Sequence, residues 1–251
     1  MLLTNDDGIE ADGLRAMHRS MLHAFQTLGQ VEPKIFVVAP DRGRSECSHS
    51  IETSIQLKLQ QHEDNWYSVN GTPVDCIRVA LFAMNLKPDI VFSGINAGAN
   101  LGVNLMVSGT FAAAREASLL GVPAMAASHY RRPEVDRTWD HASAWMFEPI
   151  KRFLNIAESG TFHASPRGPH PPLWNVNLPA IRPKFLADGN YACPSLVECD
   201  VDRCPIDREG AVGVDGNIDF QLDFHGRARE PDRDVKHCFD GKTTISSLSP
   251  L

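Results

Sequence analysis

Two adjacent carboxylates near the start of the chain, Asp6 and Asp7, have the residue type and spacing to hold a metal ion. They belong to the segment Asn5-Asp6-Asp7-Gly8, which follows the short apolar run of residues 1–4. Two carboxylates this close repel each other unless a cation or a proton lies between them. Mg²⁺ and Mn²⁺ are the hard cations that prefer such oxygen ligands. The same residue types also favour a tight turn for local backbone reasons, so this segment alone predicts a metal site or a turn equally well.

Two later polar segments could add oxygen ligands. Ser45 ends the segment 41–45, Asp-Arg-Gly-Arg-Ser, and Asn96 lies in the glycine-rich stretch 93–102; each segment follows an apolar run. Because the carboxyl ends of parallel strands meet at one edge of a sheet, we expect Ser45 and Asn96 to lie beside the acidic pair. Taken singly, each is more readily explained as a residue that forms hydrogen bonds within its own loop.

The segment Ser108-Gly109-Thr110 stands at the start of a predicted helix. Free backbone N–H groups and the helix dipole favour an anion at such a position. The glycines of residues 94–102 would let the backbone approach the same ligand closely. Ser108 and Thr110 are also suited to cap the helix, a role that does not exclude phosphate binding.

The elements that must position these residues can be read from apolar periodicity. We expect Asp12 and Thr72 to cap the first two helices and Gly29 to end the first. After a short N-terminal strand, the expected strands are residues 35–39, 89–92, 123–128 and 173–178, and the expected helices are residues 11–28, 72–84, 110–120 and 138–158. We expect a surface hairpin from residues 51–59 and 66–69, and an exposed loop at 165–172.

The alternation of strand and helix predicts an α/β fold with a mostly parallel sheet covered by helices on both faces. Beyond residue 180 the periodicity weakens, and residues 200–240 are expected to form an irregular or hairpin-like segment. We therefore divide the chain into a catalytic domain, residues 1–178, and a smaller irregular or β-rich C-terminal extension, residues 179–251.

Composition limits the class of partner. The net charge is −7, which argues against a nucleic-acid polymer as ligand, so an anionic substrate would be held by local groups, with Arg42 and Arg44 as nearby cations. No apolar run is long enough to span a membrane. The chain is expected to lack a signal peptide and to be cytoplasmic. Its six cysteines are thinly spread and are expected to be mostly reduced.

Four segments together resemble the SurE family of metal-dependent 5′/3′-nucleotidases. The family's Asn-Asp-Asp-Gly start stands at residues 5–8, and its Asp-Arg-x-Arg-Ser loop at 41–45. Its Gly-Thr-Pro-x-Asp-Cys segment stands at 71–76, and its Ser-Gly-x-Asn-x-Gly-x-Asn-x-Gly loop at 93–102. The segments occur in the family's order and at about its spacing, and the resemblance runs over residues 1–128.

This resemblance implies a site and an assembly. The implied ligands of one divalent ion per subunit, Mg²⁺ or Mn²⁺, are Asp6, Asp7, Ser45 and Asn96. The residues implied around the substrate phosphate are Asn96, Asn100, Ser108, Gly109 and Thr110. The family fold is Rossmann-like, with a C-terminal extension used to form dimers and tetramers, so a homodimer or homotetramer is expected.

The implied reaction is hydrolysis of a small-molecule nucleoside 5′- or 3′-monophosphate to nucleoside and phosphate. Asp6, Asp7 and Asn100 would be catalytic, and we favour Asp7 as the group that orients or deprotonates the water. Direct attack by water and an aspartyl-phosphate intermediate both remain open. A dinucleotide-dependent oxidoreductase is disfavoured because no Gly-x-Gly-x-x-Gly follows the first strand.

Two alternatives remain for the function. One is a broader phosphatase or exopolyphosphatase that uses the same site. The other is a catalytically inactive nucleotide-binding protein. Two departures from the family point toward the latter: Glu46-Cys47 stand where Gly-Ala is common, and the expected C-terminal extension is shorter than in relatives, which usually continue into a helix.

Overall fold

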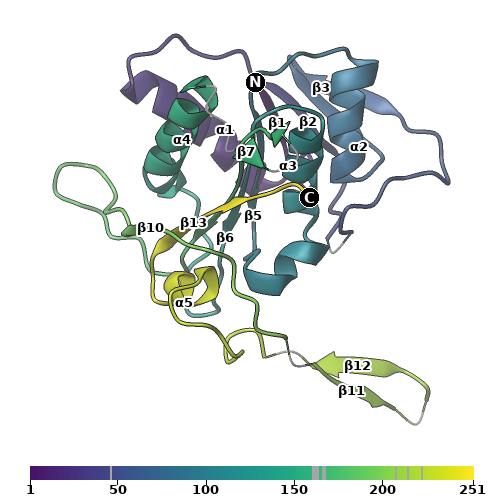
Figure 1. The fold of residues 1–251 in the computed structure, drawn as a ribbon, viewed down its shortest axis with the longest axis vertical. Helices are drawn as coiled ribbons and strands as arrows, with labels where there is room; N and C mark the ends of the chain where they lie inside the picture. Colours follow the sequence, from purple (N-terminus) through teal and green to yellow (C-terminus); the bar gives the residue numbers. More distant parts are fainter. Residues whose placement is uncertain (46, 160–163, 166–167, 207, 214, 222) are drawn as a thin grey trace.

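The main structural unit is one nine-stranded mixed sheet flanked by helices (Figure 1). This computed structural model describes residues 1–45, 47–159, 164–165, 168–206, 208–213, 215–221 and 223–251, so Glu46 lies outside the described residues. The strands of the main sheet are β1 (Leu2–Thr4), β2 (Phe36–Pro40), β3 (Leu59–Glu63), β4 (Trp66–Val69), β5 (Val91–Asn96), β6 (Ala124–His129), β9 (Leu173–Leu178), β10 (Leu196–Glu198) and β13 (Thr243–Leu248). The expected α/β class is confirmed.

The strand order places β1, and so the turn of residues 5–8 that follows it, among the central strands of the sheet. The order is β10-β13-β9-β6-β5-β1-β2-β4-β3. Every neighbouring pair is parallel except β13 with β9 and β3 with β4. The strands β5, β1 and β2 are therefore adjacent and parallel, and their carboxyl ends lie together at one edge of the sheet, as the sequence predicted.

Helices cover both faces of the sheet. They are α1 (Asp12–Thr27), α2 (Pro73–Arg78), α3 (Gly109–Leu119), α4 (Ala142–Ser159) and α5 (Asp234–Phe239), with a π-helical turn η1 (Val79–Ala83) and a 3₁₀ helix η2 (Gly102–Val107). The helices α1 and α4 pack on one face, and α2 and α3 pack on the other (Figure 1). None of the helices in the described part of the chain is both long and apolar enough to cross a membrane.

Successive strand residues enter two different cores. Leu3 and Phe92 are fully buried on the α1/α4 side, whereas Leu2 and Val91 are fully buried on the α2/α3 side. Because side chains alternate across a strand, a sheet buried on both faces requires continuous apolar runs. This explains why the central strands could be recognised in the sequence without polar alternation.

The start of α2 matches its prediction and the start of α1 does not. Thr72 caps α2, and its side chain accepts a hydrogen bond from the Asp75 backbone while the Asp75 side chain accepts one from the Thr72 backbone. Asp12 was expected to cap α1, but it is the first helical residue. The capping position is held by Ala11, which has no side-chain oxygen to offer. The carboxylate of Asp12 instead lies in the first turn, where it is favourable to the helix dipole.

The first strand of the hairpin lies later than predicted. It is β3, Leu59–Glu63, rather than residues 51–59. The Asn70 side chain accepts a hydrogen bond from the backbone N–H of Lys58 (2.6 Å) and donates one to the carbonyl of Gln56 (3.3 Å). These bonds hold the preceding segment as a loop, because its backbone groups are taken by a side chain rather than by a neighbouring strand.

The C-terminal residues complete one end of the main sheet. Strand β13 pairs antiparallel with β9, and β10 pairs parallel with β13. A small hairpin of β11 (Glu209–Val212) and β12 (Ile218–Gln221) projects away from the rest of the chain (Figure 1). The division between two domains at residue 178 stays a prediction.

The loop predicted for residues 165–172 is described only in part. Ser165 belongs to the two-residue strand β7 (Ala164–Ser165), which pairs with β8 (Gly168–Pro169). Residues 166–167 lie outside the described residues.

Candidate active site

The turn after β1 is built by its asparagine and glycine. Asn5 is fully buried; its side-chain amide donates to the Gly8 carbonyl (2.8 Å) and its amide oxygen accepts from the Gly8 N–H (3.3 Å). Gly8 has a φ of +101°, and a Cβ there would lie 2.9 Å from the Arg42 carbonyl carbon. The segment is thus a tight turn, and that turn presents Asp6 and Asp7 at the edge of the sheet.

Asp6 lies against the first turn of α3. Its side chain accepts a hydrogen bond from the Thr110 hydroxyl, and a Cβ on Gly109 would lie 3.0 Å from the Asp6 Cβ. Only 6% of Asp6 is exposed. Burial raises the pKa of Asp6 to about 6, with a further contribution from the Asp7 charge, while the hydrogen bond from Thr110 opposes the rise. Asp6 is therefore a carboxylate that a nearby cation would stabilise.

Asp7 is the more accessible of the two carboxylates. It is half-buried, and its Oδ2 accepts a hydrogen bond from the Ala97 backbone N–H (3.0 Å). Burial raises the pKa of Asp7 as well. The bond to Ala97 ties the turn after β1 to the turn after β5, although the two residues are far apart in sequence.

The segment 41–45 after β2 is fastened to the same turn. The Arg44 backbone N–H donates to the Asp6 carbonyl (2.7 Å). The Arg44 guanidinium donates to Asp41 (3.3 Å) and to the Asn70 carbonyl (2.8 Å). The Arg44 guanidinium is therefore occupied by Asp41 and Asn70 and does not line the cavity described below. Ser45 does line that cavity.

Asn96 and Asn100 are oriented by the loop between them. The side-chain amide of Asn96 donates to the Gly98 carbonyl (3.0 Å), which leaves the amide oxygen of Asn96 available. The side-chain amide of Asn100 donates to the Ser128 hydroxyl (2.8 Å), and its second N–H remains available because an amide carries two.

The backbone of Asn100 is also fixed. Its N–H donates to the side-chain oxygen of Asn177 (3.0 Å), and its carbonyl accepts from the side chains of Asn175 (2.8 Å) and Asn177 (3.0 Å). Both asparagines lie on β9, so the position of Asn100 depends on a strand that the sequence did not link to the site.

These turns enclose a cavity of about 260 Å³. It is lined by Asp6, Asp7, Ser45, Asn96, Ala97, Gly98, Ala99, Asn100, Asn104, Val107 and Ser108. The structure thus brings together the four expected metal ligands with Asn100 and Ser108. Gly109 and Thr110 do not line the cavity. Gly109 packs on Asp6, and Thr110 is fully buried and donates its hydroxyl to Asp6. Their role at the phosphate stays a prediction.

Asn104 and Val107 were missed by sequence reasoning. Both lie in η2, and i and i+3 side chains of a 3₁₀ helix lie on the same side. The only signal in the sequence was a polar residue inside the apolar segment 101–107. The 3₁₀ conformation that turns both side chains toward the cavity could not be read from it.

The donors around the cavity suit a hard divalent cation. One oxygen of Asp6 is occupied by Thr110 and one oxygen of Asp7 by Ala97, so each carboxylate keeps one oxygen for a ligand. The hydroxyl of Ser45 and the amide oxygen of Asn96 add neutral donors. No cluster of three or more His, Cys, Asp or Glu side chains could hold a metal within the described residues. The donor set is therefore two carboxylates with neutral oxygens, which is typical of Mg²⁺ or Mn²⁺.

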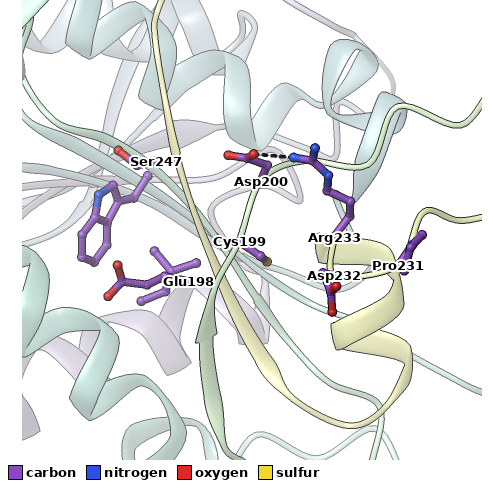
Figure 2. A pocket seen from close by; sticks show the side chains of 9 residues that line it. Glu198, Cys199, Asp200, Pro231, Asp232, Arg233 and Ser247 are labelled. Atoms are coloured by element: carbon purple, nitrogen blue, oxygen red, sulfur yellow. Dashed lines mark hydrogen bonds and ion pairs between the residues drawn. The ribbon is translucent and has the colours of Figure 1, made fainter.

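A larger cavity, about 550 Å³, lies beside the edge strand β10. Figure 2 shows its labelled side chains, among them the ion pair between Asp200 and Arg233. Glu198, Cys199 and Asp200 come from the end of β10 and the residues after it, and Asp232 comes from the segment before α5. Burial raises the pKa of the Cys199 thiol to about 12. With its arginine already paired and its thiol protonated, this cavity offers less for phosphate chemistry than the smaller one.

Comparisons with known proteins show which proteins this chain is similar to. A family model described as "Survival protein SurE" matches residues 1–194. A protein of Nostoc sp. (strain PCC 7120) is 36% identical over 99% of this chain and 98% of its own length. The protein named 5′-nucleotidase SurE from Legionella pneumophila is 45% identical over 89% of this chain and 84% of its own length. The crystal structure of a SurE protein from Aquifex aeolicus superposes with a TM-score of 0.72 at 26% identity, covering 100% of this chain and 93% of that one.

Proposed function

Because this chain belongs to the survival protein SurE family, we propose that it is a divalent-metal-dependent 5′-nucleotidase that hydrolyses nucleoside monophosphates to nucleoside and phosphate. The name of the Legionella relative supports the reaction class. The observation that carries the proposal is the cavity lined by Asp6, Asp7, Ser45 and Asn96, four residues with side-chain oxygens that come from the carboxyl ends of three adjacent strands and the turns after them.

The metal would be held by Asp6, Asp7, Ser45 and Asn96. When bound, a divalent ion supplies a Lewis acid that polarises the phosphate and favours ionisation of a water. The protein's contribution is to keep two carboxylates side by side although both pKa values are raised by burial. The hydrogen bonds from Thr110 and Ala97 each occupy one oxygen and thereby fix the orientation of the other.

The geometry favours Asp7 over Asp6 as the group that handles the water. Asp6 is almost fully buried and is tied to α3, whereas Asp7 is half-buried and faces the cavity with one oxygen. Burial raises the pKa of Asp7 in the metal-free protein, and a bound cation would lower it and keep the carboxylate charged. Asp7 would orient the attacking water and accept its proton.

The substrate phosphate would lie between Asn96, Asn100 and Ser108. The free N–H of the Asn100 side chain is directed by the bond to Ser128 and by the β9 asparagines that fix its backbone. Asn104, which shares the cavity wall, supplies a second side-chain amide. Such preorganised donors stabilise charge on a transferring phosphoryl group without reorganisation.

We also propose that the protein forms a homodimer or homotetramer. Val212, Ile218 and Phe220 are between 60% and 73% exposed on the projecting β11–β12 hairpin (Figure 1). Exposed apolar side chains gathered on one element are typical of an interaction surface. Light scattering coupled to size-exclusion chromatography tests this directly, and a monomeric mass across the working concentrations would exclude it.

The test of the reaction is phosphate release from a panel of nucleoside 5′- and 3′-monophosphates, polyphosphate and sugar phosphates, with Mg²⁺, with Mn²⁺ and with chelator. We expect turnover of 5′-monophosphates that chelator abolishes. Asp7→Asn should lower kcat by at least about a hundredfold, as loss of a general base typically does. Asp64→Asn, a charge-matched change at an exposed position of the β3–β4 hairpin, serves as the control and should keep full activity.

Each alternative outcome has a clear meaning. Full activity with chelator, or in Asp7→Asn, would overturn the metal site. A preference for polyphosphate or sugar phosphates would show that the protein is a broader phosphatase rather than a nucleotidase. Binding of nucleotides without turnover of any ester would identify a nucleotide-binding protein that has lost catalysis.

A further inference from the structure

The proposed metal site requires Ser45 to be held beside Asp6, and we propose that His49 is the positioning residue that does so, by fastening the Ser45 loop to α3. We define the Ser45 loop as residues 41–45 and 47–50. This inference rests on the proposed function, because it assigns to Ser45 the role of a metal ligand. It concerns a residue that neither lines the cavity nor belongs to the motif segments described above.

His49 is held by two hydrogen bonds that fix which ring nitrogen accepts and which donates. The Arg115 Nε–H donates to His49 Nδ1 (3.0 Å), and His49 Nε2 lies 2.8 Å from a carboxylate oxygen of Glu116. Arginine can only donate, so Nδ1 must be the acceptor. The ring proton therefore resides on Nε2 and is donated to Glu116. His49 thus bridges two successive residues of α3 with one defined orientation.

The acceptor, Glu116, is a buried charge at the centre of a larger network. Only 3% of Glu116 is exposed, and it also accepts a hydrogen bond from the Arg78 Nε–H at the end of α2 (2.6 Å). Burial alone would raise the pKa of Glu116, but the hydrogen bonds from His49 and Arg78 outweigh it and lower that pKa. The carboxylate stays charged, and hydrogen bonds to a charged acceptor are the stronger kind.

The other described contacts on the C-terminal side of the Ser45 loop have neutral acceptors, among them the Ser50 carbonyl, which accepts from the Thr72 hydroxyl (2.7 Å). Ser48 is next to His49, and it donates its backbone N–H to the Val107 carbonyl (3.1 Å) and its hydroxyl to the Met106 carbonyl (2.8 Å). Both acceptors are neutral, and both belong to residues that are exposed. Water can compete for such bonds more readily than for the bond to buried Glu116. Within the described residues of the Ser45 loop, His49 is therefore the attachment to a buried charged acceptor; the next such bond along the chain is from the Glu52 backbone N–H to Asp75 (3.0 Å).

On the N-terminal side, Ser45 follows Arg44, whose backbone N–H donates to the Asp6 carbonyl. Along the chain, Ser45 thus lies between Arg44, which is bonded to the turn after β1, and His49, which is bonded to Glu116 of α3. The same helix contacts Asp6 through Thr110. One rigid element, α3, therefore sets the positions of two ligands of the proposed metal, Asp6 directly and Ser45 through His49.

The experiment combines Mn²⁺ affinity with a double-mutant cycle. The dissociation constant of Mn²⁺ is measured from the electron paramagnetic resonance signal of free Mn²⁺ for the wild type, Ser45→Ala, His49→Leu and the double variant. We expect each single change to raise the dissociation constant about tenfold, as loss of a metal ligand or of its support typically does. The double variant should bind no more weakly than Ser45→Ala, because His49 acts through Ser45.

His49→Gln is the matched conservative variant. A glutamine amide can accept from Arg115 and donate to Glu116, so it should restore Mn²⁺ affinity to within about twofold of the wild type if the roles inferred for the two ring nitrogens hold. A role limited to general stability predicts no coupling to Ser45 and no selective rescue. Additive effects in the cycle, or unchanged affinity in His49→Leu, would overturn the inference.

Hydrogen exchange separates this inference from the proposed function. It is measured by mass spectrometry on the metal-free protein, in peptides covering residues 41–45. We expect faster exchange in His49→Leu, near-wild-type exchange in His49→Gln, and no change in the β3–β4 hairpin of either variant. A wild type that binds no Mn²⁺ would refute the metal site while leaving this measurement decisive for His49, since unchanged exchange in His49→Leu would refute the attachment itself.

Discussion

Thr110 donates its hydroxyl to Asp6, so the first turn of α3 faces a carboxylate of the protein itself. A helix N-terminus favours an anion through its free N–H groups and its dipole, and in the structure that anion is Asp6. This contact explains how a nearly buried carboxylate is kept beside a second one. It also makes Thr110 a support for Asp6.

We therefore predict that Thr110→Val weakens Mn²⁺ binding. Valine has nearly the same shape but no hydroxyl, so the orientation of Asp6 is lost and the dissociation constant should rise by roughly tenfold to a hundredfold, as for other supports of metal ligands. The same titration of Mn²⁺ by electron paramagnetic resonance measures it. Thr110→Ser keeps the hydroxyl and should bind Mn²⁺ nearly as tightly as the wild type, whereas equal affinity in Thr110→Val would show that this contact is not needed.

Gly8 should be much less tolerant of a side chain than Gly29. Both have positive φ, +101° and +65°, but only at Gly8 would a Cβ meet a backbone atom, the Arg42 carbonyl carbon at 2.9 Å, while nothing lies within 4 Å at Gly29. We expect Gly29→Ala to lower the free energy of unfolding by about 1 kcal/mol. Gly8→Ala should cost about 3 kcal/mol, since strain and a backbone clash add. Urea denaturation compares them, and equal losses would refute the close approach.

A buried histidine pair should make the protein sensitive to mild acid. His129 donates from Nδ1 to the Tyr130 carbonyl (2.9 Å), so its Nε2 accepts from His141 Nε2 (2.7 Å) and both rings are neutral. Burial, with Arg131 nearby, lowers the pKa of His129 to about 2 and that of His141 to about 4. The unfolded chain, with pKa values near 6.5, therefore binds protons that the folded chain does not.

The stabilisation from this pair is complete above about pH 6.5 and is lost as the pH falls toward the folded pKa values. We expect each histidine to lower the free energy of unfolding by roughly 1.4 kcal/mol per pH unit in that window. Urea denaturation at pH 7, 6 and 5 measures the slope. The double variant His129→Leu/His141→Leu should show a shallower slope, because the two side chains that take up protons on unfolding are gone. The slope that remains comes from groups common to both proteins, and an identical slope would contradict the assignment.

The capping box of α2 should contribute measurably to stability. Asp75 accepts hydrogen bonds from the backbone N–H groups of Thr72 (2.8 Å) and Glu52 (3.0 Å). The capping residue Asp75 therefore also holds the segment that precedes the β3–β4 hairpin. We expect Thr72→Ala to lower the midpoint of urea unfolding through a loss of about 1 to 2 kcal/mol. Thr53→Ala, at an exposed position nearby, should change it by less than about 0.5 kcal/mol, and similar losses in both would remove the special role of the cap.

Local physics made much of the fold predictable. The central strands are continuous apolar runs because the sheet is buried on both faces, and the cap of α2 is formed by residues three apart. The turn at Asn5 and Gly8 is likewise a local arrangement, since the bonds that form it connect those two residues. The expectation that the sheet is parallel then places the turns after β1, β2 and β5 at one edge, and the structure shows that these three strands are neighbours.

The sequence by itself determined that an acidic turn, a serine loop and an asparagine loop would follow three buried strands. Only the tertiary structure decided that Thr110 serves Asp6, that His49 reaches Glu116, that the asparagines of β9 fix Asn100, and that Asn104 joins the cavity wall. The first three relationships join residues 104, 67 and 75 positions apart. No local propensity encodes such contacts, because a side chain's partner is chosen by the packing of whole helices and strands, whereas turns, caps and apolar runs are set by neighbours along the chain.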